Sequence, residues 1–308
     1  MHDLKRANAL LRERLEMRMP AEGSFSTRIA GVDIHRRDSV NAPTNCLYTP
    51  RIIKLVQGKK RCLVGRDEFM YGEDDIFIAG VDMPNTSNIF EASPKKPCLS
   101  ITIDLDRNLI AQLAMEMAAP TPEEDGAATG LLVQPAEPEM LDAFVRLEAL
   151  LDKPEQIPVL APMIIKEIHF RALVGEGGNR LRLFYTYGSQ KNQIARSIAW
   201  LRENFREKLA IEEMAEKVHM APSTFHHHFK EVTTVSPLQF QKRLRLHEAQ
   251  RLMLMDDMDA NSACEAVGYE SLTQFNREYK RHFGEPPRRN VTRWQREHSP
   301  SLAFMPGE

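Results

Sequence analysis

The alternation of apolar and polar positions predicts β-strands in the first third of the chain. Residues about 27–105 hold several short runs rich in β-branched and aromatic side chains, separated by turn residues. Two of these runs are broken at Gln57 and Gly58, which predicts a β-hairpin at that point. Several short strands at this spacing are typical of a barrel or a sandwich.

The pattern at the N-terminus is that of a short amphipathic helix, with apolar side chains recurring at helical spacing among charged ones. The apolar positions are Leu4, Ala7, Leu10, Leu11 and Leu15. The segment lacks the apolar core of a signal peptide. No run in the chain approaches the roughly 18 apolar residues of a membrane span, so we expect no membrane association.

After the strands the pattern becomes helical. The segment 119–139 is rich in proline, glycine and acidic residues, and we expect a loop there. Apolar spacing then predicts helices at 139–152 and about 161–174. The apolar positions of the first of these helices spread wider than one narrow stripe. That helix is therefore the predicted dimerisation element, with simple coverage of the barrel as the alternative.

The whole chain is predicted to divide into three parts. Glycines and polar residues at 175–190 predict a boundary segment, and the pattern is almost entirely helical from residue 191 onward. The expected fold class is α+β. The predicted parts are an N-terminal domain at 1–190, an all-helical domain at 191–298 and a tail at 299–308.

The helical region contains an internal repeat. Each copy predicts a short helix, a tight turn and a second helix with two aromatic side chains four residues apart, followed by a proline. These landmarks are Phe225, Phe229 and Pro237 in the first copy, and Phe275, Tyr279 and Pro287 in the second. The layout is that of a helix-turn-helix, and the segment between the copies predicts one long helix.

Three consecutive histidines, His226, His227 and His228, raise the question of a metal site. Successive helical residues are turned by about 100°, so with Phe225 and Phe229 buried the first two histidines point outward and His228 lies near the core edge. Three successive helical positions do not converge on one ion, and we expect no nearby carboxylate or cysteine to complete a ligand set. The sequence therefore predicts no metal site here.

Outward residues near the start of the second helix of a helix-turn-helix reach base edges in the major groove. The candidates in the first copy are Ser223, Thr224, His226 and His227, and those in the second are Ser271, Thr273, Gln274 and Arg277. Base contacts are assigned to His226, His227, Thr273, Gln274 and Arg277. Basic residues at or beyond the ends of these helices, where phosphates would lie, are Lys230, Lys280, Arg281, Arg288, Arg289 and Arg293. The alternative is that these side chains are only the solvated face of each helix.

Residues about 191–295 resemble the DNA-binding domain of the AraC/XylS family of transcription regulators. The stretches that carry the resemblance are "IEEMAEKVHMAPSTFHHHFK", "SPLQFQKRLRLHEAQRLM" and "AVGYESLTQFNREYKRHFGEPP". The upstream stretches "YTPRIIKLVQGKKRCLVGRDEFMYGEDDIFIAGVDMP" and "EASPKKPCLSITIDLD" are similar to the N-terminal domain of one subgroup of that family. One departure is Ala221, which precedes Pro222 where family members often have a serine N-cap.

The resemblance implies a cupin-like β-barrel with flanking helices, followed by two helix-turn-helix motifs joined by a long helix. It also implies a transcription regulator that binds double-stranded DNA and responds to a small-molecule or electrophile effector through its N-terminal domain. We expect a homodimer and an activator, for which RNA polymerase would be a further partner.

Composition and charge add little to this interpretation. Apolar residues make up 42% of the 308 residues and charged residues 27%, which is ordinary for a soluble globular protein. The net charge is −2, so any DNA-binding surface must be local. Four cysteines without a CxxC motif favour a reducing cytoplasm.

Two other classes of function compete with this interpretation. A cupin-type metalloenzyme needs clustered histidines with a carboxylate, whereas His2, His35 and His169 are widely separated. No nucleophile or phosphate-binding motif is present either, so we expect no enzyme, no catalytic residue and no cofactor. A DNA-independent scaffold is the second alternative, and it would leave the basic second copy idle.

The predicted strand region also holds the candidates for an effector site. Cys46, Cys62 and Cys98 fall in or beside predicted strands, where cysteines are usually small core residues, although a reactive thiol that reports aldehydes or oxidants is the alternative. These three cysteines and Tyr48 are the candidate effector-binding residues. Gln57 and Asp82 are further residues that would line a pocket or serve as ordinary barrel and turn residues.

Overall fold

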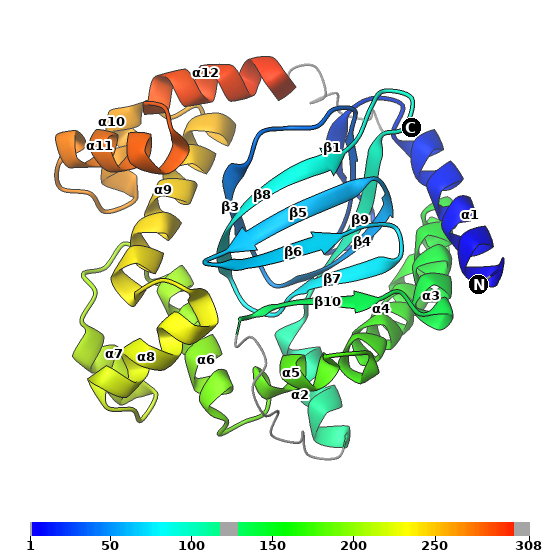
Figure 1. The fold of residues 1–308 in the computed structure, drawn as a ribbon, viewed down its shortest axis with the longest axis horizontal. Helices are drawn as coiled ribbons and strands as arrows, with labels where there is room; N and C mark the ends of the chain where they lie inside the picture. The colour runs from blue at the N-terminus through cyan, green and yellow to red at the C-terminus, as the bar shows by residue number, and fades with distance from the viewer. Residues whose placement is uncertain (1, 118–128, 299–308) are drawn as a thin grey trace.

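A computed structural model describes residues 2–117 and 129–298 of the chain (Figure 1). Within these residues, ten strands form two antiparallel sheets that pack face to face. The first sheet runs in the order β1 (Gly23–Ser26), β2 (Val32–Arg37), β9 (Cys98–Asp104), β4 (Arg51–Gln57), β7 (Asp75–Ala79) and β10 (Leu131–Pro135). The second runs in the order β3 (Thr44–Tyr48), β8 (Met83–Glu91), β5 (Lys59–Val64) and β6 (Asp67–Tyr71). The expected α+β class is confirmed.

Helices cover the outer face of the first sheet (Figure 1). Helix α1 (His2–Arg18) is the predicted N-terminal amphipathic helix, and its Leu11 and Leu15 are fully buried against β4 and β9. Helix α4 (Ile157–Val174) confirms the second predicted helix, although it begins earlier than expected. Strand β4 is buried on both faces because helices lie on one side of it and the second sheet on the other.

Helix α3 (Pro138–Ala149) confirms the helix predicted at 139–152, but its apolar side chains are used inside the molecule. Met140, Phe144 and Leu147 are buried between α1 and α4. The buried carboxylate of Glu148 accepts a hydrogen bond from Arg14 of α1 at 3.0 Å. The width of its apolar face therefore reflects packing between two neighbouring helices.

The hairpin predicted at Gln57 and Gly58 is wrong. The two strands exist, but β4 belongs to the first sheet and β5 to the second, so the chain crosses between sheets at Gly58. Gly58 has a φ of 92°, and a Cβ on it would lie 2.6 Å from the carbonyl oxygen of Glu91. The turn signal was correct because only glycine fits this position, whereas strand pairing is decided by long-range contacts.

The β structure is also wider than the predicted range of 27–105. Strand β10 lies in the predicted loop at 119–139, where Leu131 and Leu132 are buried and pair with β7. Residues 119–128 of that predicted loop lie outside the described residues, as does the predicted tail at 299–308. An edge strand of this kind is stabilised by its neighbour, which local composition does not reveal.

The predicted boundary at 175–190 contains a short helix, α5 (Gly178–Leu183), that packs against the first domain. Leu181 and Phe184 are buried, and the Tyr185 hydroxyl donates to the carbonyl oxygen of Gly80 at 2.5 Å. Helix α2 (Arg107–Glu116) lies beside α4 and α5 and is capped by the Asp106 side chain. The segment thus ties the following helices to the sheets.

Residues 190–298 are almost entirely helical, as predicted (Figure 1). Its helices are α6 (Gln190–Glu203), α7 (Ile211–Lys217), α8 (Pro222–Thr233), α9 (Pro237–Met255), α10 (Ala260–Ala266), α11 (Leu272–Phe283) and α12 (Pro287–His298). Helix α9 is the predicted long helix between the two copies. In the described part of the chain, no helix is both long enough and apolar enough to cross a membrane.

Candidate nucleic-acid interface

The first copy of the repeat has the predicted orientation. Phe225 and Phe229 of α8 are fully buried and pack with Met214 and Ala215 of α7, and the Phe229 ring lies 5.5 Å from the ring of Phe240 on α9. Their burial leaves His226 and His227 exposed and His228 partly buried, as the helical periodicity required. Ser223 and Thr224 are exposed in the first turn of the helix.

The start of α8 lacks a side-chain cap, as the alanine at position 221 indicated. Ala221 is the N-cap residue and provides no side-chain hydrogen bond, while Pro222 occupies the first helical turn. In the second copy Ser271 caps α11, and its hydroxyl accepts a hydrogen bond from the backbone N–H of Gln274 at 3.3 Å. The Ser271 side chain is therefore engaged within the protein, although its surface is exposed.

The second copy presents the same arrangement. Phe275 and Tyr279 are fully buried, whereas Thr273, Gln274 and Arg277 are exposed on the opposite face of α11. The Gln274 amide donates to the Glu278 carboxylate at 3.3 Å. Arg277 makes no hydrogen bond or ion pair with any described residue, so its guanidinium group is available to a ligand.

The basic residues predicted to meet phosphates are mostly exposed. Lys230, Lys280, Arg281, Arg288 and Arg289 all have exposed side chains. Arg293 is different, because it pairs with Glu285 at 2.6 Å and is partly neutralised.

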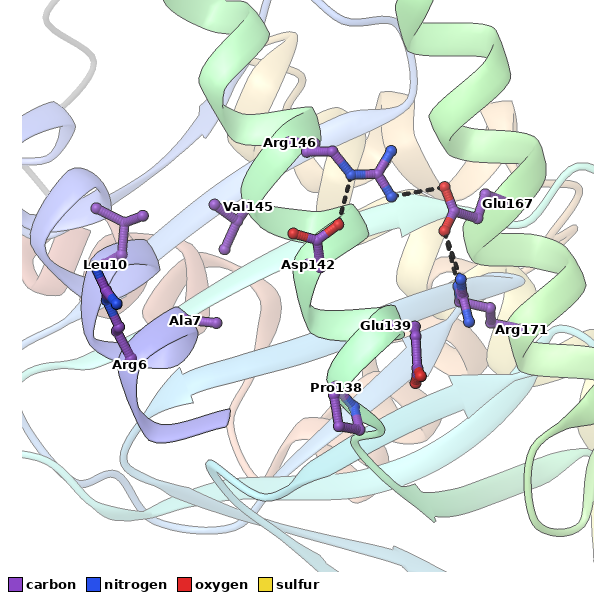
Figure 2. Close-up of a pocket in the computed structure, with 10 residues that line it drawn as sticks. All are labelled: Arg6, Ala7, Leu10, Pro138, Glu139, Asp142, Val145, Arg146, Glu167 and Arg171. Carbon is purple, nitrogen blue, oxygen red and sulfur yellow. Dashed lines mark hydrogen bonds and ion pairs between the residues drawn. The ribbon is translucent and has the colours of Figure 1, made fainter. Parts of the chain in front are cut away.

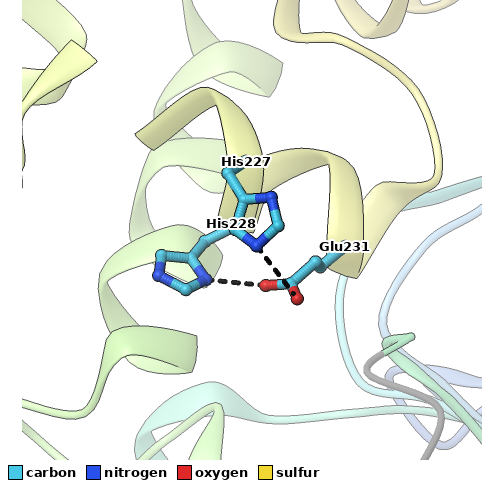
Figure 3. Close-up of side chains that lie close together, drawn as sticks. All are labelled: His227, His228 and Glu231. Carbon is cyan, nitrogen blue, oxygen red and sulfur yellow. Dashed lines mark hydrogen bonds and ion pairs between the residues drawn. The ribbon is translucent and has the colours of Figure 1, made fainter. Parts of the chain in front are cut away.

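The prediction that no carboxylate lies near the histidine run is wrong. Glu231, one turn further along α8, contacts two of the three histidines (Figure 3). Its Oε2 lies 2.6 Å from Nδ1 of His228, and its Oε1 lies 3.4 Å from Nε2 of His227. The signal in the sequence was the spacing His-His-x-x-Glu, which places i,i+3 and i,i+4 partners on one helix face.

The two halves of the chain match protein families. Residues 28–180 match the family described as the AraC-type transcriptional regulator N-terminus, and residues 214–293 match a helix-turn-helix domain. The chain belongs to the AraC-type transcriptional regulators. The resemblance seen in the sequence is thus confirmed.

Relatives and solved structures agree with this assignment. The chain is 32% identical over 112 residues to the uncharacterized HTH-type transcriptional regulator YobQ of Bacillus subtilis. The aligned segment is 36% of this chain and 46% of that protein. The chain is also 25% identical over 101 residues to the HTH-type transcriptional activator RhaS of Pectobacterium carotovorum. That aligned segment is 33% of this chain and 36% of the RhaS chain. The chain therefore spans less than half the length of these curated relatives.

ToxT of Vibrio cholerae has the same fold as this AraC-type regulator. The ToxT complex with (E)-4-(8-methylnaphthalen-1-yl)but-3-enoic acid superposes with a TM-score of 0.60 and 12% identity, covering 85% of this chain and 97% of that chain. ToxT bound to an unsaturated fatty acid gives a TM-score of 0.57 with 9% identity, covering 84% and 94%. The predicted order of a β domain followed by an all-helical domain is confirmed.

The β domain of this AraC-type regulator contacts both helix-turn-helix copies. Gly65, in the turn between β5 and β6, lies directly against Thr234, the residue that ends α8. The approach is so close that a Cβ added to Gly65 would lie 2.8 Å from Cβ of Thr234. The Asn45 amide on β3 donates to the carbonyl oxygen of His282 in α11. The second sheet thus touches the C-terminal ends of both candidate DNA-reading helices.

Asp82, a candidate pocket residue, instead forms a buried ion pair between the two halves of the regulator. Its carboxylate accepts a hydrogen bond from Arg107 of α2 at 3.0 Å and another from Arg202 of α6. Burial raises the pKa of Asp82, although Arg202 and Arg107 act to lower it. Gln57, the other candidate, donates to the carbonyl oxygen of Pro97 at 2.9 Å and has a structural role.

The candidate effector residues lie together between the two sheets. The Tyr48 hydroxyl is 3.0 Å from Ser87 Oγ, and its ring lies edge-on to Phe77 of the first sheet. Burial raises the pKa of Cys46 to about 11 and that of Cys62 to about 12. Burial also raises the pKa of Cys98. These thiols are therefore protonated at neutral pH, the form that reacts slowly with electrophiles.

Lys60 is an interior residue that the sequence pattern did not single out. Lys60 on β5 lies directly opposite Tyr71 on β6, so the two side chains point to the same face of the second sheet. The buried Tyr71 ring stacks on Phe77 of the first sheet, and that face is therefore the one between the sheets. Lys60 is half-buried and makes no hydrogen bond or ion pair with any described residue. Burial lowers the pKa of Lys60, and the neighbouring cations Arg37 and Arg51 lower it further. An unpaired amine in this position suits an anionic ligand.

Proposed function

We propose that this protein is a sequence-specific DNA-binding transcription regulator that responds to a small molecule held by its N-terminal domain. The observation that carries the proposal is the repeated helix-turn-helix, in which a buried aromatic pair supports an exposed polar face in each copy. Helix α9 joins the copies over 19 residues, or about 28 Å. That length is comparable with the roughly 34 Å between successive major grooves on one face of DNA.

The base contacts are proposed for His226, His227, Thr273, Gln274 and Arg277. Ser223 and Thr224, at the start of α8, and Ser271, the N-cap residue of α11, are proposed as further DNA contacts. Lys230, Lys280 and Arg281 are proposed to contact phosphates, because they are exposed and cationic. We keep the division into a sensor and dimerisation domain at 1–190 and a DNA-binding domain at 191–298 as part of this proposal.

Replacing Arg277 with alanine should weaken specific DNA binding by roughly 1–3 kcal/mol and relax specificity at one base position. The reason is that an exposed, unpartnered guanidinium group can bond guanine through two hydrogen bonds. Arg288→Ala is the matched control, since loss of a phosphate contact weakens all sequences about equally and lowers the salt slope by about 1. Fluorescence anisotropy over a series of single-base operator variants measures both effects. A uniform loss for Arg277→Ala would contradict the base contact.

For the effector we propose a small organic acid whose carboxylate contacts Lys60. The unpaired interior amine supports this, and so does the binding of carboxylic acids by ToxT, which shares the fold. The test is a panel of aliphatic and aromatic carboxylates, each compared with its neutral amide. Some of the carboxylates should raise the melting temperature of the protein, and their amides should not. Lys60→Met should abolish that increase. An equal increase in the variant would overturn the assignment, and adducts on Cys46, Cys62 or Cys98 found by mass spectrometry would favour an electrophile instead.

We further propose a homodimer formed through α4. Four large apolar side chains lie along its exposed face, at helical spacing: Val159, Met163, Phe170 and Val174. A groove between α1 and α3 lies nearby, and the charges at its rim, Asp142, Arg146, Glu167 and Arg171, already pair with one another (Figure 2). An exposed apolar strip of this kind is a candidate protein-interaction surface.

The double variant Met163→Glu/Phe170→Glu should therefore convert a dimer to a monomer in light-scattering measurements. Phe90→Glu, at an equally exposed site on β8, is the control and should leave the dimer intact. A monomeric wild-type protein, or a dimer unaffected by the double variant, would contradict this interface.

Activation of transcription, with RNA polymerase as partner, is the proposed outcome of DNA binding, supported by the similarity to the activator RhaS. A cytoplasmic location is proposed because the regulator must reach DNA and its four cysteines, all among the described residues, are free thiols. Reporter transcription with and without the gene for this protein tests the direction of regulation, and repression would overturn the activator proposal.

A further inference from the structure

The side chains of His227, His228 and Glu231 form a compact cluster on α8 (Figure 3). With about 100° between successive residues, Glu231 lies about 40° beyond His227 and about 60° short of His228 around the helix axis. It is therefore placed between the two imidazoles, one turn further along. Both rings approach its carboxylate, while the remaining histidine, His226, is not part of the cluster.

The three groups offer a ligand set that zinc and related ions prefer. One nitrogen from each imidazole and one carboxylate oxygen all lie within 4.8 Å of one another. A tetrahedral zinc ion with bonds of about 2.0–2.2 Å holds neighbouring ligands about 3.3 Å apart. Nε2 of His227 is 3.4 Å from Oε1 of Glu231, close to that spacing, whereas Nδ1 of His228 is 2.6 Å from Oε2 and would move away from it when an ion binds. Solvent reaches all three side chains, which are 69%, 24% and 42% exposed in chain order.

We propose that His227, His228 and Glu231 bind a divalent transition-metal ion, of the zinc type, on the first helix-turn-helix. Two histidines and one glutamate are a known zinc ligand set, and they leave a fourth position open to water or to another ligand. The simpler alternative is that both imidazoles only donate hydrogen bonds to Glu231. The two alternatives differ in one measurable property, which is whether the three side chains together bind a metal ion.

The ion would change the surface that faces DNA. A divalent ion would add two positive charges beside the single negative charge of Glu231, so the metal-bound cluster would carry a net positive charge. This would favour nearby phosphates rather than repel them. It would also hold the His227 ring beside Glu231, so that in the metal-bound form only His226 of the two proposed base-contacting histidines would remain free to contact a base. This consequence rests on the proposed DNA-binding function, whereas metal binding itself does not.

The test is titration of the metal-free, full-length protein with Zn²⁺ by calorimetry, and with Co²⁺ by visible absorption, in the absence of DNA. Since changing residues that only support metal ligands costs about 10–100-fold in affinity, His228→Asn and Glu231→Gln should each weaken binding by at least about tenfold. His226→Asn is the matched control, because it removes a neighbouring exposed histidine outside the cluster, and it should keep wild-type affinity. Circular dichroism checks that each variant remains helical.

Equal Zn²⁺ affinity in the wild type, Glu231→Gln and His228→Asn would overturn the site, and so would an equal loss in His226→Asn. Operator affinity with and without Zn²⁺ is then measured separately in the wild type and in Glu231→Gln. An increase in the wild type alone supports the effect on DNA binding. If the protein binds Zn²⁺ through these residues but binds no DNA sequence, the metal site stands and the proposed function fails.

Discussion

Replacing Asp82 with alanine should lower the free energy of unfolding by about 2–3 kcal/mol. A broken buried ion pair typically costs 3–5 kcal/mol, but here the two guanidinium groups keep 39% and 45% of their side-chain surface exposed and water solvates them in part. The carboxylate itself is fully buried. Its loss removes the anion that joins Arg107 on α2 to Arg202 on α6.

The same change should also weaken the link between the two halves of the protein. Scanning calorimetry of Asp82→Ala should show the helical half melting before the β domain, because Arg202 belongs to the first helix after the boundary segment. Arg202→Met removes only the contact across the boundary, whereas Arg107→Met removes only the contact within the N-terminal part. The first should reproduce the separation of transitions and the second should not. A single unchanged transition in Asp82→Ala would contradict this role.

Replacing Phe275 with alanine should cost about 3–5 kcal/mol within the second helix-turn-helix. Its ring is fully buried and lies 5.4 Å from the ring of Tyr269 and 5.5 Å from that of Tyr279. The buried side chains around it form a cluster separate from the main core, so the loss is expected to unfold the second copy alone. Phe229→Ala should damage the first copy, whose buried residues join the core of the N-terminal domain.

The two variants should differ in the DNA that they select. Phe275→Ala should lose sequence preference in one half of the binding site and keep it in the other, and Phe229→Ala should do the reverse. Leu272→Ala, a change at a side chain that is 39% exposed in the same helix as Phe275, is the control and should retain both halves. Loss of both halves in the Phe275 variant, with the first copy still folded, would contradict independent reading by two copies.

Local periodicity predicted which faces of α8 and α11 are buried better than it predicted the pairing of the strands. The spacing of Phe225 and Phe229 alone determined which face of α8 is buried, and that placed His226 and His227 outward. Such an inference needs only the helical repeat, since neighbours on a helix face are three or four residues apart. The same rule also places Glu231 beside the histidines, once it is applied one turn beyond the histidine run.

Apart from the missed Glu231, the main errors concern contacts between distant residues. The strands on either side of Gly58 were correct, but each found its partners in a different sheet. Strand β10 pairs with β7, far away along the chain, and its composition alone indicated a loop. Asp82 and Lys60 likewise owe their roles to residues that the fold brings to them. Pairing of this kind depends on the whole fold rather than on local propensity.

Sequence-specific reading of DNA by both helix-turn-helix copies is tested most directly by selection of DNA fragments with the purified full-length protein at stated salt concentrations, followed by sequencing. We expect an enriched motif with two boxes about one helical turn, or roughly 34 Å, apart, one for α8 and one for α11. Arg277→Ala should relax the preference at one base position within one of these boxes. Equal recovery of all sequences at both low and physiological salt, with and without carboxylates that stabilise the protein, would contradict sequence-specific reading.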